Sequence, residues 1–512
     1  MKKRSRTEYS LINALTGMGG YALNTVLGFV CRIIFVRTLS AEYLGISGLF
    51  TNILSMLSLA ELGISSAIIY ALYKPIAENN ENKITAIMQF YKKAYALIGT
   101  VVAMLGLAML PFLKVIIKDA PDIKENLYVI YLLFLLNTVL TYFFSYRSSL
   151  MMAMQRNYIV SAYSYAVTIG QSFFQVIFLL LTHEYIIYLL IQAAGGIFYN
   201  LWISGKVIKD YPYIKNKNVE PLSKEEKKSL FWNIKALTVN KLSGVLVNST
   251  DNIVITYFLG ISSVGFASNY ILFTSTLDVL VTQMFNSLTG SVGNFNATAD
   301  DEEKYKFLKT LNLANFWFYG WAAIGMFLVS GDMVKLLFGS EYVLPAYIPL
   351  ILAINMYSIG MLHSFYTYKS TLGLFKYGQY ILLFTGFINI ILDIILGKLW
   401  GMLGIYLATL ISRLCTNLWY EPYAIYKYGL KKNPILYLGR YGIFLCVLAV
   451  SGGLSWFLCG FVNLGNIANV VVKVIICTVV PNCVFVLSFM RTDEFKYLKS
   501  KVARIGKSIL KR

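Results

Sequence analysis

Long apolar segments separated by short polar turns follow one another along almost the whole chain. A helix that spans a bilayer needs about 20 predominantly apolar residues, and about fourteen segments meet this length. They lie at residues 11–36, 45–72, 94–117, 127–147, 158–181, 185–204, 232–259, 264–290, 311–330, 343–366, 378–397, 401–424, 440–461 and 467–490. The pattern predicts an all-α polytopic membrane protein with about fourteen transmembrane helices.

The composition supports this interpretation. Of the 512 residues, 57% are hydrophobic and only 14% are charged, whereas about a quarter of the residues of a soluble protein are charged. No sizeable soluble domain can therefore be placed. The basic amino terminus resembles the start of a signal peptide, but the apolar segment after it is too long and contains Arg32, so we expect it to be retained. The six cysteines show no paired spacing, so no disulfide, metal site or cofactor is implied.

The charges predict how the chain is oriented. It carries 45 Lys and Arg against 25 Asp and Glu, and the basic excess gathers in the loops on the side that holds both termini. The positive-inside rule therefore predicts that both termini face the cytoplasm. The basic tail at residues 491–512 directly follows a span, so we expect it to meet anionic lipid headgroups. Nucleic acid is not expected as a partner.

A long polar stretch divides the chain into repeated parts. We predict an N-terminal six-helix lobe at 1–204, a charged cytoplasmic linker at 205–231 and a C-terminal six-helix lobe at 232–430. Residues 431–512 would add two further helices and a basic cytoplasmic tail. The lobes match at an offset of 220 to 222 residues, so that Leu39 and Gly45 recur as Leu259 and Gly265. Two lobes of the same topology, here parallel repeats, are typical of transporters with a site between them.

Eight ionisable residues stand out within the predicted spans, where a charge costs about 2.5 to 3.5 kcal/mol at the bilayer centre. They are Arg32, Glu61, Lys241, Asp251, Asp278, Asp393, Arg413 and Lys473. Such residues must face each other or water. Asp393 and Lys473 lie away from the predicted cleft, so we expect them to form structural pairs. Four bases balance four acids, and buried pairs that only hold helices together would give the same pattern.

Polar residues at helical spacing predict a cleft between the lobes. The first helix carries Asn24 and Arg32 on one small and polar face, and the first helix of the second lobe carries Asn248 and Asp251, with Lys241 beside them. Positive charge on both walls of one cleft favours an anionic ligand. His363 lies near a helix end, too isolated to suggest catalysis.

Three short motifs resemble a known family. They are RTLSAEYLG at residues 37–45, TDNIVI at residues 250–255 and LFG at residues 337–339. Together with the pattern of spans, these motifs resemble the polysaccharide transporters, the Wzx-type flippases of lipid-linked oligosaccharide. That family belongs to the multidrug/oligosaccharidyl-lipid/polysaccharide (MOP) exporter superfamily.

This resemblance implies a two-lobed bundle in the bacterial cytoplasmic membrane. It would move undecaprenyl-diphosphate-linked oligosaccharide repeat units to the outer leaflet by alternating access, for surface or capsular polysaccharide. The cationic cavity residues that would bind the diphosphate are Arg32, Lys241 and Arg413. The two helices at 440–461 and 467–490 are similar to the pair that forms a groove for the prenyl tail in lipid II flippases.

The resemblance also implies an energy source and partners. Coupling to H⁺ or Na⁺ is common in the superfamily and would use Glu61, Asp251 or Asp278. The partners would be the lipid-linked oligosaccharide, membrane lipids, a polysaccharide polymerase and other assembly proteins. We expect no enzyme activity.

Other functions stay open at this point. A cation-coupled multidrug exporter or a lipid II flippase would have the same fold, although a drug exporter favours acidic cavity walls and this cleft has both signs. A membrane polysaccharide polymerase or ligase is a different class. Such an enzyme needs large external loops, and the longest external connection here runs only from about Lys118 to Asn126.

Overall fold

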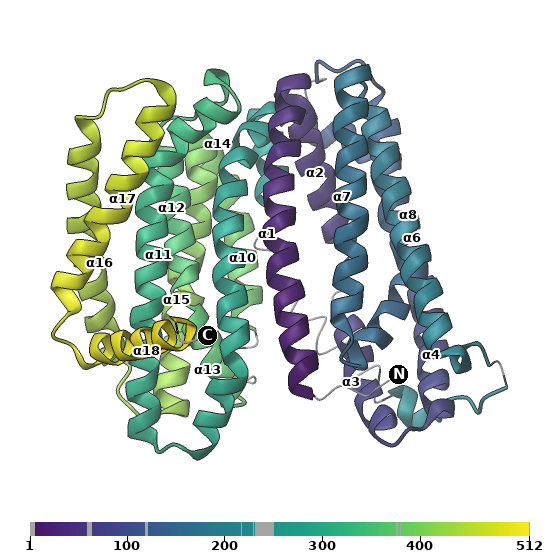
Figure 1. The fold of residues 1–512 in the computed structure, drawn as a ribbon. Helices are drawn as coiled ribbons and strands as arrows, with labels where there is room; N and C mark the ends of the chain where they lie inside the picture. Colours follow the sequence, from purple (N-terminus) through teal and green to yellow (C-terminus); the bar gives the residue numbers. More distant parts are fainter. Residues whose placement is uncertain are drawn as a thin grey trace. The chain divides into compact units, whose positions relative to one another are not determined.

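The computed structural model describes residues 6–58, 64–117, 121–216, 218–228, 230, 250–374, 377–378 and 380–510. Almost all of these residues are helical, and none of them lies in a β-strand. They form two compact units, which we call the N-terminal unit (Met1–Gly265) and the C-terminal unit (Phe266–Arg512). Figure 1 draws the helices of each unit. The predicted all-α membrane fold is confirmed.

The N-terminal unit is built around packed helix pairs. Its helices are α1 (Arg6–Thr38), α2 (Ala41–Leu57), α3 (Ile64–Ala77), α4 (Glu81–Ala108), α5 (Leu113–Ile116), α6 (Leu127–Ala153), α7 (Asn157–Thr182) and α8 (Tyr185–Asp210), with the short turns η2 (Leu110–Phe112) and η3 (Pro212–Lys215). Helix α6 packs against α4 and α8, and α7 packs against α1 and α8. The Tyr131 hydroxyl donates to the Gly106 carbonyl oxygen (2.9 Å), which joins α6 to α4.

The C-terminal unit is organised around one long helix, α11. Its helices are α10 (Ile261–Thr298), whose first residues belong to the N-terminal unit, α11 (Asp301–Leu337), α12 (Tyr347–Gly360), α13 (His363–Thr371), α14 (Ile381–Cys415), α15 (Asn417–Ala424), α16 (Ile435–Gly460), α17 (Asn466–Phe489) and α18 (Asp493–Leu510), with η4 (Ser340–Tyr342) and the π-helix η5 (Ile425–Gly429). Helix α11 packs against α12, α16, α17 and α18. Phe316 of α11 stacks on Phe444 of α16 with ring centroids 4.4 Å apart.

Local sequence signals explain where several helices begin. The Asp300 carboxylate accepts from the Glu303 backbone N–H (2.7 Å), and the Glu303 carboxylate accepts from the Asp300 N–H (3.2 Å). This capping box starts α11 and stabilises a helix end by roughly 1 kcal/mol. Asn80 and Asn126 cap α4 and α6 in a similar way, each accepting from a backbone N–H at 2.9 Å.

The exposed surface of the helices is apolar, as a bilayer requires. On α16, Trp456 is 63% and Phe457 is 60% exposed, while Ser451 and Ser455 of the same helix are fully buried. Eleven helical segments among the described residues are long and apolar enough to cross a membrane. The chain is therefore a multi-pass membrane protein.

The predicted number of fourteen spans stays a prediction. The predicted spans 378–397 and 401–424 largely fall within one continuous helical segment, Ile381–Gly429, which comprises α14, α15 and η5. Within α14 the backbone is non-helical at Gly401 (φ 58°, ψ −136°). Because this φ lies in the left-handed region, a glycine is favoured at the break. The predicted spans 45–72 and 232–259 contain residues outside the described ranges.

A close contact joins the starts of α2 and α10 within the N-terminal unit. A Cβ added to Gly45 would overlap the carbonyl oxygen of Ile261, and a Cβ added to Gly265 would overlap the carbonyl oxygen of Ala41. The Ser262 hydroxyl also donates to Glu42 (3.3 Å). Gly45 and Gly265 are equivalent positions of the repeat predicted from the sequence, and each lies against the backbone of the other helix.

Candidate functional site

Two predicted cavity residues, Asn24 and Arg32, lie on α1 and are half-buried. One turn beyond Arg32, the Phe35 ring packs edge-on against Tyr185 (centroids 5.7 Å apart) and Tyr188 (5.2 Å) of α8, which fixes this part of α1. The Asn24 amide oxygen is buried without a hydrogen-bond partner among the described residues.

Of the other residues predicted to line the cleft, only some lie within the described ranges. Asp251 lies in the helical segment 250–259 of the N-terminal unit and is half-buried. Glu61, Lys241 and Asn248 lie outside the described residues. Their predicted roles stay predictions.

In the C-terminal unit, Asp278 is the centre of a polar cluster built from three helices. The Tyr319 hydroxyl of α11 donates to Asp278 Oδ1 (2.7 Å), and His363 Nε2 of α13 lies 3.3 Å from the same oxygen. The Tyr319 and His363 rings are parallel, with centroids 5.6 Å apart. The Asp278 side chain is 42% exposed and that of His363 is 17% exposed. A carboxylate, an imidazole and a phenol at these distances can bind and exchange a proton.

This cluster corrects the sequence interpretation of His363 as an isolated residue. The two residues are 85 positions apart in the sequence, Asp278 on α10 and His363 on α13, and the tertiary fold of the C-terminal unit brings the imidazole to the carboxylate. No local sequence motif predicts a contact between His363 and Asp278.

Arg413, the third predicted phosphate-binding residue, lies in the last turn of α14. It is only 8% exposed. Its positive charge acts electrostatically on Asp278 and on Tyr366 of α13. Arg413 and Asp278 are therefore members of one charged neighbourhood inside the C-terminal unit.

The sequence analysis did not single out Glu421, although it lies in the predicted span 401–424. Lys369 Nζ donates to both Glu421 carboxylate oxygens (2.7 and 2.9 Å). The Glu421 side chain is fully buried and that of Lys369 is 15% exposed. Glu421 meets the criterion that was applied to the other residues, because it is a charged residue inside an apolar segment. Lys369 holds a buried carboxylate, in addition to lying near a helix end.

The two residues predicted to be structural do have polar partners inside the C-terminal unit. Lys473 Nζ of α17 lies 2.6 Å from Asp332 Oδ2 of α11. The Asn389 amide donates to Asp393 Oδ1 (3.0 Å) within α14, and both side chains are fully buried. Among the described residues, no cluster of three or more His, Cys, Asp or Glu residues could hold a metal ion.

An apolar groove of about 570 Å³ lies between α11, α12, α14 and α16. Its lining includes Phe327, Ile354, Leu410, Leu445 and Trp456. This volume is within the usual range for ligand pockets, about 300 to 1,000 Å³. The lining residues include several from α16 and none from the described part of α17, so only one helix of the expected pair contributes.

One family model and several solved structures match the chain. The family model described as "Polysaccharide biosynthesis protein" matches residues 10–292. The lipid II flippase MurJ in its inward closed conformation superposes with a TM-score of 0.65 at 15% identity, covering 93% of this chain and 99% of that one. No curated protein sequence matches the chain.

Multidrug transporters have a similar fold. A mutant of the Vibrio cholerae MATE transporter VcmN superposes with a TM-score of 0.56 at 13% identity, covering 84% of this chain and 99% of that one. An inward-facing multidrug resistance MATE family transporter of the MOP superfamily gives 0.57 at 13% identity, covering 82% and 99%. At such low identities the likeness establishes the fold alone.

Proposed function

Because the chain belongs to the polysaccharide biosynthesis protein family and has the fold of MOP transporters, we propose that it is a flippase for lipid-linked oligosaccharide. Its substrate would be an oligosaccharide repeat unit on undecaprenyl diphosphate, moved from the cytoplasmic to the outer leaflet of the bacterial cytoplasmic membrane. The family match over residues 10–292 carries this proposal, because it connects a transporter fold to polysaccharide synthesis. The assignment of the chain as a membrane transporter with the MOP fold holds whichever substrate it carries.

The chemistry of the substrate explains why the protein is needed. Two phosphates and several sugars cannot cross hydrocarbon unaided, so the headgroup requires a polar path with positive charge. We assign the diphosphate to Arg32, Lys241 and Arg413. Guanidinium groups form paired hydrogen bonds with phosphate oxygens, and a lysine adds a point charge. We assign Asn24, on the same polar face of α1 as Arg32, to a sugar hydroxyl.

The lipid tail needs an apolar surface that is continuous with the bilayer. We assign it to the groove lined by Leu445 and Trp456 of α16 together with α11, α12 and α14. The lining is mostly apolar, with Tyr357, Ser358 and Tyr441 as its polar members, so a prenyl chain would cover few polar groups there.

Asp278 is the best described candidate for cation coupling to H⁺ or Na⁺. It receives hydrogen bonds from Tyr319 and lies beside His363, and it stays accessible at 42% side-chain exposure. A proton bound there would remove one negative charge close to Arg413. The polymerase and assembly proteins that receive the product remain proposed partners.

Liposome reconstitution tests the proposal directly. The purified chain is reconstituted with a fluorescently labelled undecaprenyl-diphosphate oligosaccharide, and leaflet transfer is followed by quenching with an impermeant reductant. We expect transfer by the wild type and a loss of at least about tenfold in rate for the variant that combines Arg32→Ala with Lys241→Ala. Arg491→Ala, which removes an exposed arginine outside the proposed path, should transfer normally. Full transfer by the double variant would refute the anion site.

Substrate competition separates the alternatives. The fold of the MATE transporters keeps drug export open as a second candidate. Export of cationic dyes without transfer of the labelled lipid would favour that function. Transfer of lipid II in preference to the oligosaccharide lipid would identify the other flippase, and polymer lengthening by the purified chain alone would indicate a polymerase.

A further inference from the structure

Helix α18 starts where a membrane span ends. The apolar segment of α17 runs from Ile467 to Phe489. The chain then turns, with the Thr492 backbone N–H donating to the Phe489 carbonyl oxygen (2.9 Å), and continues as α18 from Asp493. Figure 1 shows α18 running crosswise to α16 and α17. A helix in this position lies at the depth of the lipid headgroups.

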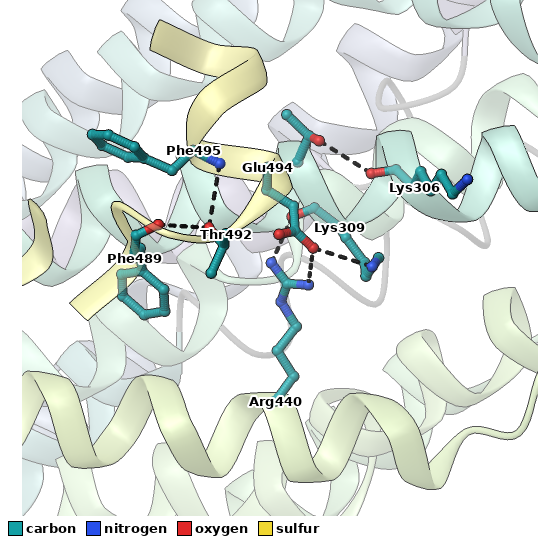
Figure 2. A network of polar contacts seen from close by, with 8 residues as sticks. Lys306, Lys309, Arg440, Phe489, Thr492, Glu494 and Phe495 are labelled. Atoms are coloured by element: carbon teal, nitrogen blue, oxygen red, sulfur yellow. Dashed lines mark hydrogen bonds and ion pairs between the residues drawn. The ribbon is translucent and has the colours of Figure 1, made fainter. Parts of the chain in front are cut away.

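The first turn of α18 is fixed to the C-terminal unit by a buried ionic cluster. Glu494 Oε1 accepts from Arg440 Nη1 of α16 (2.9 Å) and lies 3.2 Å from Lys309 Nζ of α11. Figure 2 shows Arg440 and Lys309 converging on this carboxylate. The Glu494 side chain is only 11% exposed. Next to it, the Phe495 ring stacks on Trp317 of α11, with centroids 5.7 Å apart.

The exposed positions of α18 are rich in lysine. Lys496, Lys499 and Lys501 are all exposed and are spread over about half of the helix circumference, while Tyr497 packs against Phe307 of α11. We call these three lysines the basic face. Of the two acidic residues in α18, Glu494 is turned inward and balanced by Arg440, so only Asp493 is exposed beside the lysines. These exposed side chains therefore carry a net positive charge, three lysines against Asp493, which lies 3.7 Å from Lys496.

The sequence continues this pattern beyond the described side chains. Apolar residues stand at positions 502, 505 and 509, at the three- and four-residue spacing of one helix face. Arg504 and Lys507 stand between them. A helix with one apolar and one basic side is typical of segments that lie in the plane of a membrane surface.

We propose that the basic face of α18 binds the anionic phospholipid surface of the leaflet at which α17 ends. Charge complementarity carries this assignment, since each lysine near an anionic surface strengthens association by about fivefold. Position supports it as well, because a span holds α18 beside the headgroups and keeps their local concentration high. The inference concerns the membrane contact of the chain and is independent of the transported substrate.

Hydrogen exchange on the full-length protein tests this inference. The chain is placed in nanodiscs of phosphatidylcholine alone or with about a third phosphatidylglycerol, and exchange is measured over residues 493–510. We expect the anionic lipid to slow exchange in α18 by at least about tenfold at 0.1 M salt, and 0.5 M salt to reverse most of this slowing.

Two matched variants make the test specific. The combination Lys496→Gln, Lys499→Gln and Lys501→Gln should reduce the lipid-dependent slowing to less than about twofold. A control with three exposed lysines of the 218–228 segment replaced, Lys224→Gln, Lys227→Gln and Lys228→Gln, should keep the slowing in full.

Three results would overturn the proposal. They are equal exchange in neutral and anionic discs, an unchanged response in the basic-face variant, and slowing by an added RNA oligomer in neutral discs without any response to phosphatidylglycerol. The salt comparison uses the wild type alone, so it decides the question even if a variant folds poorly.

Discussion

Replacing Glu494 by Gln should release the first turn of α18 from the bundle. Burial by itself raises the pKa of the Glu494 carboxyl, but hydrogen bonds and positive charge from Arg440 and Lys309 outweigh burial and lower this pKa from 4.5 to about 2. At about 1.36 kcal/mol per unit, the ionised carboxylate stabilises the docked state by about 3 kcal/mol. Its removal should increase local opening of α18 about a hundredfold.

Hydrogen exchange in detergent measures this opening. The protection of amides in residues 493–501 should fall about a hundredfold in Glu494→Gln, while the amides of α11 should keep theirs. Asp493→Asn is the matched control, because it removes the same charge from the neighbouring position. Asp493 is fully exposed and pairs only with exposed Lys496 at 3.7 Å, so the control should change protection less than threefold. Equal protection in Glu494→Gln and the wild type would refute the reasoning.

The same carboxylate predicts a pH dependence. Because the pKa of Glu494 is lowered in the folded state, its stabilisation is complete above pH 4.5 and is lost as the pH falls toward 2. At pH 3, about 2 kcal/mol of this contribution should be gone. The protection of α18 in the wild type should therefore approach that of Glu494→Gln between pH 5 and pH 3, after correction for intrinsic exchange. A difference between the two proteins that stays constant over this range would contradict the assigned pKa.

Three further changes test other parts of the structure. Lys369→Met leaves the buried Glu421 carboxylate without its cation and should lower the free energy of unfolding by about 3 to 5 kcal/mol, measured as a lower melting temperature. The double variant Lys369→Met, Glu421→Gln should recover much of this loss. Asp278→Asn should abolish the dependence of lipid transfer on an imposed pH gradient while the protein stays abundant; an unchanged dependence would remove this acid from coupling. Gly45→Ala should destabilise the chain by about 1 to 3 kcal/mol through overlap with a backbone carbonyl, whereas Gly28→Ala, where a Cβ meets nothing within 4 Å, should be tolerated.

The fold class could be predicted from the sequence because each transmembrane helix is indicated by its own run of apolar residues. A run of about 20 apolar residues predicts a span wherever it occurs, and no partner has to be known. The division of residues 378–424 was also predicted, and the break at Gly401 explains why one continuous helical segment contains two predicted spans. The count stays open only where residues lie outside the described ranges.

Pairings between distant residues could not be predicted in this way. Lys473 was expected to have a structural partner, but its partner Asp332 lies just beyond a predicted span and 141 positions away. The contact of His363 with Asp278 likewise depends on how α13 and α10 are placed within the C-terminal unit. Helical spacing tells which residues share a face, but not which face of another helix lies opposite.

The ion pairs and hydrogen bonds of the structure distinguish the acidic residues of the C-terminal unit as candidates for cation coupling. A carboxylate that binds a cation from a water-filled path must be reached from that path. Glu421 and Asp393 are fully buried, and Asp332 is 26% exposed with Lys473 held at 2.6 Å. Asp278 is the most accessible of these four, at 42% side-chain exposure, and its two hydrogen-bonding neighbours, Tyr319 and His363, carry no fixed positive charge. The fixed charge of Arg413 acts on Asp278 without an ion pair between these two described residues at contact distance. Structural partners therefore account for the other three acids, and Asp278 is the acid that we propose for coupling.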